Sequence, residues 1–299
     1  SQVSSTDLGF VAGHRLNAAG RLDDMSVGIE CLLAESSASA RILAKQLNDF
    51  NKERKEIERT MQTDAMTLLE KGDLSVGNED FALSLFREDW HQGVVGILAS
   101  RIRERFHRPT IVFAQSGDGE LKGSGRSIPG VHLRDALDRV ATSTPDLITK
   151  FGGHAMAAGL SLSQDDLPRF REAFNRVVAQ ALNGSLPDQV TVTDGQLPES
   201  DLTLGLAEAL ESGGPWGQAF EAPSFEGVFT ISDMRVVGEK HLKFRLFTEA
   251  GLIDAIAFNA EVETWTRDKP KTLRCVYRPC VNEYRGGRRL QLQIEALWA

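Results

Sequence analysis

The sequence has no long apolar run and only three cysteines. None of its apolar stretches approaches membrane-spanning length, and its N-terminus shows no basic segment followed by an apolar one. We therefore expect no membrane-spanning helix, no secretory leader and no membrane partner. Cys31, Cys275 and Cys280 have neither the spacing of metal ligands nor the density of a disulfide framework. The expected location is the cytoplasm, with all three thiols reduced.

Histidines are also few. The six of them are scattered along the chain, at His14, His91, His107, His132, His154 and His241. A two-metal centre needs several ligands close together, and we find no motif that would supply them. No metal site is expected in this sequence.

The remaining composition is that of an ordinary globular protein. The 299 residues are 41% hydrophobic and 25% charged, which is enough for a sizeable core and for two or three domains. The formal net charge of -8 is uneven, because residues 184–224 hold seven acidic residues and no Lys or Arg. Residues 80–183 and 225–299 are close to neutral or slightly basic, so a nucleic-acid partner is not excluded.

Residues 1–37 contain a glycine-flanked segment, residues 13–21, that we expect to be a loop. Arg15 and Arg21 stand six apart in it, with Asn17 between them. Guanidinium groups suit two-point contact with a phosphate, and an amide can hydrogen-bond a ligand or the backbone. The alternative, left open, is that the arginines tie the loop to nearby carboxylates.

A long helix is expected next. Residues 38–71 contain no proline or glycine, and apolar residues recur at steps of three, four and seven. This pattern predicts one amphipathic helix, on the order of 50 Å long, with a solvated face of mixed charge. With the polar break that follows, the segment 38–79 is expected to connect two domains.

Residues 80–183 alternate between strand and helix patterns, which predicts an α/β domain. Strands are expected at 81–86, 110–114 and 120–128, the third exposed and polar, and helices after residue 89 and at 133–141 and 166–182. Three small-residue segments of this domain are candidates for one anion site.

Each of the three segments has a feature that suits a phosphate. His91 lies in a turn before a helix, whose N-terminal N–H groups favour an anion. Ser124 and Arg126 offer a hydroxyl and a guanidinium beside glycines. The glycine pair 152–153 lets the backbone approach a ligand, His154 follows, and the small residues after it are expected to begin a helix. The alternatives are that His91 and His154 are turn residues whose hydrogen bonds are made within the protein, and that Arg126 forms a surface ion pair.

Residues 184–224 are expected to form an acidic linker with a short helix at 202–211 and a rigid turn that holds a tryptophan. From residue 225 to 299 the pattern is β throughout, and about five short antiparallel strands predict a barrel of the oligonucleotide-binding kind. Its two tyrosines, Tyr277 and Tyr284, lie among arginines, so that rings could stack on unpaired bases and guanidinium groups could bind a phosphate backbone. The alternative is that the tyrosines are core residues or lie at a solvated hairpin tip. The expected single-stranded-DNA surface is Trp216, Lys243, Tyr284, Arg285 and Arg288.

Five stretches, in the same order along the chain, resemble bacterial RecJ, the family of 5′-to-3′ exonucleases specific for single-stranded DNA. They are residues 15–25, 90–102, 123–128, 151–160 and 214–217. The resemblance covers the whole chain and implies the C-terminal portion of such a protein. Its parts would be the end of the metal-dependent phosphoesterase domain (1–37), the connecting helix, a DHH-associated α/β domain (80–183), the linker, and an oligonucleotide-binding domain (225–299).

The resemblance also implies a division of labour. Family members hold Mn²⁺ or Mg²⁺ in a phosphoesterase domain whose ligand motifs this sequence lacks. This segment is therefore expected to contain no catalytic residue, to bind no metal and to be inactive alone. It would bind single-stranded DNA and recognise its 5′ end, in an enzyme used in DNA repair and recombination. The residues expected to hold the terminal phosphate and adjacent backbone are Arg15, Asn17, Arg21, His91, Ser124, Arg126, Gly152, Gly153 and His154.

A protein partner and two other functions are also considered. RecJ-like enzymes work with the single-stranded-DNA-binding protein, and the arginines at 285–289 are a candidate site for its acidic tail. The chain is alternatively a non-catalytic module that binds single-stranded DNA or a protein. A related phosphodiesterase acting on short RNA or cyclic dinucleotides is a further alternative, but such enzymes lack the final barrel.

Overall fold

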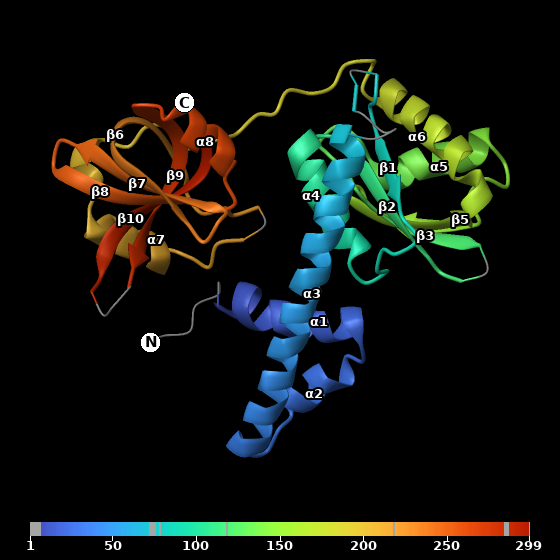
Figure 1. Cartoon of the computed structure of the whole chain (residues 1–299), viewed down its shortest axis with the longest axis horizontal. Helices are drawn as coiled ribbons and strands as arrows, with labels where there is room; N and C mark the ends of the chain where they lie inside the picture. The colour runs from blue at the N-terminus through green and yellow to red at the C-terminus, as the bar shows by residue number, and fades with distance from the viewer. Residues whose placement is uncertain are drawn as a thin grey trace. The chain divides into compact units, whose positions relative to one another are not determined.

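The chain folds into two compact units, Ser1–Gln189 and Val190–Ala299, and each is described by itself. The structure is a computed structural model that describes residues 7–71, 76–77, 79–117, 119–217, 219–283 and 287–298 (Figure 1). Within these ranges, no helix combines the length and the apolar character needed to cross a membrane.

The first unit begins with short helices packed against one long helix. They are the π-helical turn η1 (Asp7–Ala12), α1 (Gly13–Leu22), α2 (Ser26–Leu32) and α3 (Ser37–Lys71). The expectation of a loop at 13–21 is therefore wrong. Because Ala18 and Ala19 are fully buried and α1 packs on α3, tertiary contacts stabilise a helix that its glycines disfavour.

The predicted long helix is confirmed. α3 has 35 residues, which at 1.5 Å per residue makes it about 50 Å long. It runs from the N-terminal helices to the α/β sheet (Figure 1). Leu47 is buried in its first half, and Met61, Ala65 and Leu69 join a buried cluster with the helix α4 (Val95–Phe106) of the sheet domain. The same helix thus holds both parts of the unit.

The α/β part is a five-stranded sheet in the order β1-β2-β3-β5-β4. Its strands are β1 (Leu83–Phe86), β2 (Thr110–Gln115), β3 (Glu120–Arg126), β4 (Lys150–Gly153) and β5 (Ala157–Ser163). β1 and β2 are parallel, and the other neighbours are antiparallel. The strand expected to be exposed, β3, is instead the central one.

Glycine explains why β3 resembles a polar strand in the sequence. Leu121, Gly123 and Gly125 alternate along its buried face. A Cβ on Gly123 would lie 2.6 Å from the Phe113 ring, and one on Gly125 would lie 2.8 Å from Leu133. The core therefore requires glycine at both positions, and the missing side chains hide the buried face from a hydrophobicity pattern.

Helices cover the two faces of the sheet unequally. On one face lie α5 (Leu133–Ser143) and α6 (Leu167–Ala181), which is preceded by the turn η2 (Gln164–Asp166). On the other face, α4 and the end of α3 cover β1 and β2, and α4 also packs on β3. Beyond α4 this second face is exposed, at Gly159 on β5 and Gly152 on β4.

The Gly-Gly-His stretch is part of a hairpin between β4 and β5, so the helix expected after it is wrong. Gly153 has a φ of 145°, and a Cβ there would lie 2.5 Å from both the Ala157 carbonyl oxygen and the Ala158 Cα. From residue 157 to 160, burial alternates with a period of two: Ala158 and Leu160 are buried and Gly159 is exposed. The small residues allow close strand pairing and do not begin a helix.

The second unit is a closed five-stranded barrel with two short helices. Its elements are η3 (Glu199–Asp201), α7 (Leu204–Ser212), β6 (Phe225–Val237), β7 (His241–Thr248), β8 (Gly251–Ala257), α8 (Val262–Asp268), β9 (Thr272–Asn282) and β10 (Arg289–Trp298). The strand order is β10-β8-β7-β6-β9, with a parallel pair between β10 and β8. This confirms the predicted oligonucleotide-binding barrel. α8 corrects the expectation that the region is β throughout.

The barrel interior explains the strand pattern of β7. Leu242, Phe244 and Leu246 are fully buried, and the residues between them lie on the outer side. Tyr277 is 1% exposed, and burial raises its pKa to about 12. This tyrosine is therefore a core residue, as the alternative interpretation had it.

Candidate nucleic-acid interface

The first turn of α4 packs against two side chains of β3. α4 begins at Val95, and its N-cap residue Val94 makes no side-chain hydrogen bond to the helix. A Cβ on Gly96 would lie 2.9 Å from the Ser124 Oγ and 3.2 Å from the Arg126 Nη2. Glycine therefore lets a hydroxyl and a guanidinium lie beside a helix N-terminus, where the backbone N–H groups favour an anion.

Arg126 is partly buried and surrounded by like charge. Its Nη1 donates to the Gly125 carbonyl oxygen at 2.8 Å and to the Ser124 Oγ at 3.3 Å. Burial lowers the pKa of Arg126, and the positive charges of Arg21 and Arg103 lower it further. Among the described residues, no carboxylate forms an ion pair with it. A guanidinium stays charged in proteins. Arg126 therefore carries a positive charge that no carboxylate of the described residues compensates.

Arg21 is held in place by the turn before α4. Its Nη1 donates to the Gly93 carbonyl oxygen at 3.0 Å. A Cβ on Gly93 would lie 2.0 Å from the Arg21 carbonyl oxygen, so only glycine permits this approach. His91 Nδ1 accepts a hydrogen bond from the Gly93 N–H at 3.0 Å, which shapes the turn and leaves the histidine exposed.

Arg103 is a member of this group that the sequence interpretation missed. It lies seven residues after Gly96 on α4, hence on the same side of the helix two turns further on. Its Nη2 pairs with Glu104 Oε1 at 3.1 Å, while its Nε is buried without a hydrogen-bond partner in the described structure. The seven-residue spacing was the available signal. We call Arg21, Arg103, Ser124 and Arg126 the arginine cluster.

A row of small residues extends from the arginine cluster across the sheet. Ser124 pairs with Gly159, and Gly159 pairs with Gly152. Two strand spacings put Ser124 and Gly152 about 10 Å apart. A Cβ on Gly152 would meet nothing within 4 Å, so the face is open there. An extended ligand can lie on this glycine row without meeting a side chain.

His154 lies in the neighbouring row of the same sheet. Arg126 pairs with Ala157, whose carbonyl oxygen accepts the His154 N–H at 2.8 Å. The side chain of His154 is exposed, about 10 Å from Arg126 at the usual strand spacing. The three small-residue segments of the α/β domain are therefore brought together at one region of the sheet.

Arg15 has partners away from the arginine cluster. Its Nε donates to Asn48 Oδ1 at 3.1 Å, and its Nη1 donates to the Val11 carbonyl oxygen at 2.8 Å. On a helix, residues six apart point about 120° away from each other, so Arg15 and Arg21 diverge. Asn17 is exposed and lies one turn before Arg21 on the same side of α1. The structure thus places Asn17, and not Arg15, on the side that carries Arg21.

Basic residues expected on the barrel surface form ion pairs within this unit. Lys243 Nζ pairs with Asp254 Oδ2 at 2.8 Å. Arg288 pairs with Glu208 at 2.7 Å and with Glu283 at 3.3 Å. A nucleic acid would have to exchange with these carboxylates.

Trp216 packs against its own unit. Its indole N–H donates to the Leu210 carbonyl oxygen at 2.8 Å, and its ring centroid lies 4.9 Å from that of Phe220. These contacts hold the turn after α7 to the end of that helix. Tyr284 and Arg285 lie outside the described residues, so their assignment stays a prediction.

Two exposed aromatic residues on the barrel were not predicted. Phe247 of β7 is 52% exposed, and Phe258, just after β8, is 50% exposed. The Phe258 ring packs edge-on against His241 at 5.2 Å between centroids. Arg245 is exposed on the outer side of β7, and its Nε lies 3.6 Å from Asp254 Oδ1. We call Phe247, Phe258, His241 and Arg245 the barrel face. The alternation along β7 was the available signal for Phe247, because every second residue of a barrel strand faces outward.

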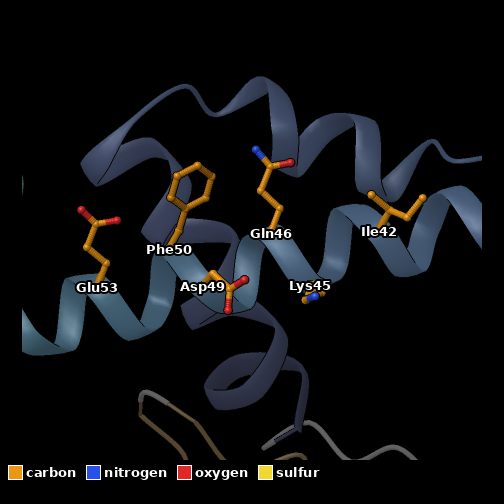
Figure 2. Close-up of a pocket in the computed structure, with 6 residues that line it drawn as sticks. All are labelled: Ile42, Lys45, Gln46, Asp49, Phe50 and Glu53. Atoms are coloured by element: carbon orange, nitrogen blue, oxygen red, sulfur yellow. The ribbon is translucent and has the colours of Figure 1, made fainter.

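Other concave or acidic parts of the molecule do not extend this interface. In the described ranges, no group of three or more His, Cys, Asp or Glu side chains is placed to hold a metal ion, so these residues do not fit a two-metal site. Figure 2 shows a groove on α3 lined by Ile42, Lys45, Gln46, Asp49, Phe50 and Glu53. All six come from one helix and carry both signs of charge, as a solvated helix face does.

One family model matches the α/β part of the first unit, and a second matches most of the second unit. The DHHA1 domain model matches residues 78–180, and the RecJ OB domain model matches residues 193–296. The class is thus a DHHA1 domain joined to an oligonucleotide-binding domain. This chain carries both of these domains of RecJ-type proteins, which confirms the resemblance to the C-terminal portion of RecJ predicted from its sequence.

Relatives in this family are longer than the chain. The single-stranded-DNA-specific exonuclease RecJ of Dickeya dadantii (strain 3937) is 51% identical over 300 residues, which is 100% of this chain and 52% of that protein. Crystal structures of RecJ from Thermus thermophilus in complex with Mg²⁺ and with Mn²⁺ are 27% identical, with TM-scores of 0.78 and 0.77. They cover 99% of this chain, which covers 44% and 42% of theirs. The chain spans about half the length of the curated relatives it matches.

Proposed function

We propose that this chain is the part of a RecJ-type 5′-to-3′ exonuclease that binds single-stranded DNA and recognises its 5′ end. The supporting observation is the arginine cluster, in which Arg126 lies beside a helix N-terminus and two further arginines. A terminal phosphate monoester carries close to two negative charges at neutral pH, whereas an internal diester carries one. A cluster of positive charges should therefore bind a terminal phosphate more tightly than an internal one, and this preference would set the polarity of digestion.

The residues would divide the work according to their positions. Arg21, Arg103, Ser124 and Arg126 would neutralise the terminal phosphate, and Gly152, Gly153 and His154 would hold the adjacent backbone. They would position the scissile bond and transfer no proton. Metal-dependent hydrolysis, with Mg²⁺ or Mn²⁺, would be carried out by the half of the RecJ-type protein that lies outside this chain.

The barrel would hold the strand several nucleotides away from its end. Stacking of a base on an aromatic side chain contributes about 1–3 kcal/mol, and it tolerates any sequence. Phe247 and Phe258 offer exposed rings for this purpose, with Arg245 beside them. Such contacts would add affinity and processivity to an enzyme of DNA repair and recombination in the cytoplasm.

Fluorescence anisotropy tests the proposal. Single-stranded DNA with a 5′ phosphate and the same strand with a 5′ hydroxyl are each titrated with the chain at two salt concentrations. We expect the phosphorylated end to bind more tightly and both affinities to fall as salt rises. Equal affinity for the two ends would contradict end recognition, and absence of binding would contradict DNA binding altogether.

A second candidate is a module that binds single-stranded DNA or a protein without taking part in hydrolysis. The described residues favour it because they do not fit a metal site. A phosphodiesterase for short RNA or cyclic dinucleotides is not favoured, since it would not need the barrel. Addition of Mn²⁺ or Mg²⁺ to the chain with labelled single-stranded DNA should produce no digestion, and digestion would refute the assignment of hydrolysis to the other half.

The single-stranded-DNA-binding protein is the partner we propose, through its acidic tail. Arg288 and Arg289 are exposed, and the carboxylates already paired with Arg288 show the chemistry that a tail would supply. Titration with a tail peptide should shift the backbone amide NMR signals of both arginines. Unmoved signals at an excess of peptide would remove this partner from the account.

A further inference from the structure

A second cationic row crosses the exposed sheet face beyond the glycine row. Lys122 of β3 pairs with Ser161 of β5, and Ser161 pairs with Lys150 of β4. Both lysines are exposed, and their side chains have no ion pair or hydrogen bond within the described structure. Two free ammonium groups thus flank one serine, Ser161, which is itself buried.

This lysine row lies on the same face as the arginine cluster. Residues two and four apart on a strand share a face, so Lys122, Ser124 and Arg126 project from the same side of β3. Lys122 is about 14 Å from Arg126 along the strand, and Lys150 is about 10 Å from Lys122 across it. On β4 and β5, the glycine row of Gly152 and Gly159 lies between the lysine row and the end of the sheet that pairs with Arg126.

We propose that Lys122 and Lys150 bind internal phosphates of a DNA strand whose 5′ end is held by the arginine cluster. The open sheet face is then a track for the DNA backbone, and this inference rests on the proposed function. An ammonium is a point charge with three rotatable donors, so it accepts a phosphodiester in many orientations. At 3.4 Å per stacked nucleotide, the distance from Arg126 to Lys122 corresponds to about four nucleotides.

Protection of a sheet edge is the competing explanation for one of these lysines. β4 is the last strand of the sheet, and lysine on an edge strand prevents pairing with other molecules. This explanation covers Lys150. It does not cover Lys122, because β3 has a neighbouring strand on each side. A ligand that needs both charges explains both residues.

The test compares two double variants that change the net charge equally. Lys122→Gln/Lys150→Gln removes the lysine row, and Lys45→Gln/Lys52→Gln removes two exposed lysines of α3. The probes are a 5′-phosphorylated thymidine dinucleotide, which is too short to reach the lysine row, and a hexanucleotide, which spans about 20 Å when stacked.

We expect the first variant to bind the hexanucleotide several-fold more weakly at low salt. The slope of log affinity against log salt should become shallower by about 1.4, which is about 0.7 for each lost phosphate contact. Its affinity for the dinucleotide should not change. The α3 variant should bind both probes like the unaltered chain, and both variants should keep the unaltered melting temperature because all four side chains are exposed.

Three results would overturn the track. Unchanged hexanucleotide binding by the first variant would leave the lysines without a role in binding. Equal weakening by both variants would show a general effect of net charge. Equal loss for dinucleotide and hexanucleotide would show that the variant disturbs the arginine cluster itself. Failure of the unaltered chain to bind either probe would instead refute the proposed function, and it is seen before any variant is compared.

Discussion

Gly93 and Gly96 lie on either side of the start of α4, and each touches an element that carries an arginine. Gly93 meets the backbone of Arg21, and Gly96 meets the side chain of Arg126. A side chain at either position would move a guanidinium away from the helix N-terminus. At the scale of single residues, the interface depends on two missing Cβ atoms as much as on its charges.

Replacement of Gly96 by alanine should separate stability from binding. Alanine favours a helix over glycine by about 1 kcal/mol, which offsets part of the steric strain. The new Cβ would nevertheless displace Ser124 Oγ and Arg126. We expect the urea midpoint to change little and the affinity for 5′-phosphorylated single-stranded DNA to fall several-fold.

Gly205→Ala is the matched control for this variant. Gly205 lies in α7, and a Cβ there would be 3.9 Å from Thr203 Oγ1, an ordinary contact. This variant should bind DNA as the unaltered chain does. If Gly96→Ala did so too, Gly96 would not belong to the end-binding site.

At the scale of elements, the β4–β5 hairpin gives two adjacent glycines different tasks. Gly153 has a backbone conformation that other residues rarely adopt, and it packs directly against Ala157 and Ala158. Gly152 has open space where a side chain would be. The hairpin therefore needs Gly153 in order to fold, whereas Gly152 keeps its face free for a ligand.

Alanine should change the free energy of unfolding strongly at Gly153 and hardly at all at Gly152. Gly153→Ala combines a strained φ with a clash, and we expect it to lower the free energy of unfolding of the first unit by about 2 kcal/mol or more. Gly152→Ala should change that free energy by no more than about 0.5 kcal/mol. Urea unfolding followed by circular dichroism measures both values. Similar losses in the two variants would contradict the division of tasks.

Particular elements show how far the sequence predicts this molecule. α3 is predicted well because its apolar stripe repeats over 35 residues without a helix breaker. The burial of β3 and the helix α1 are not, because glycines needed for packing look like signals for exposed or irregular chain. Ser124 and Arg126 could be predicted from their own neighbours in the sequence. For Arg103 the sequence offers only its seven-residue spacing from Gly96, and that signal is not enough, since the side of α4 that faces the sheet depends on how the helix is rotated.

At the scale of the whole molecule, the two units differ in their buried titratable groups. Cys275, Tyr277 and Cys280 all lie on β9 of the barrel. Burial is the main cause that raises the pKa of Cys275 and of Tyr277 to about 12, and the pKa of Cys280 to about 11. The barrel therefore holds these groups in their protonated, neutral forms.

The raised pKa values predict that the barrel loses stability in alkali. A group whose pKa is higher in the folded state contributes stability below its unfolded pKa, which is 9.0 for the thiols, and that contribution is lost as the pH rises toward 11 to 12. We expect a loss of about 1.4 kcal/mol per pH unit per thiol above pH 9. Calorimetry at a series of pH values measures this slope. Cys275→Ala/Cys280→Ala should make it shallower, and an unchanged slope would contradict the assignment.

The most direct test of the account is a thermodynamic cycle on Arg126 and a 5′ phosphate. The unaltered chain and Arg126→Gln are each titrated with single-stranded DNA that carries or lacks the phosphate. A hydrogen bond between charged groups contributes about 1.5–3 kcal/mol, so we predict a coupling free energy of that size between side chain and phosphate. The preference for the phosphorylated end would then largely disappear in the variant. A coupling near zero, with the preference intact, would show that the arginine cluster does not hold the 5′ end.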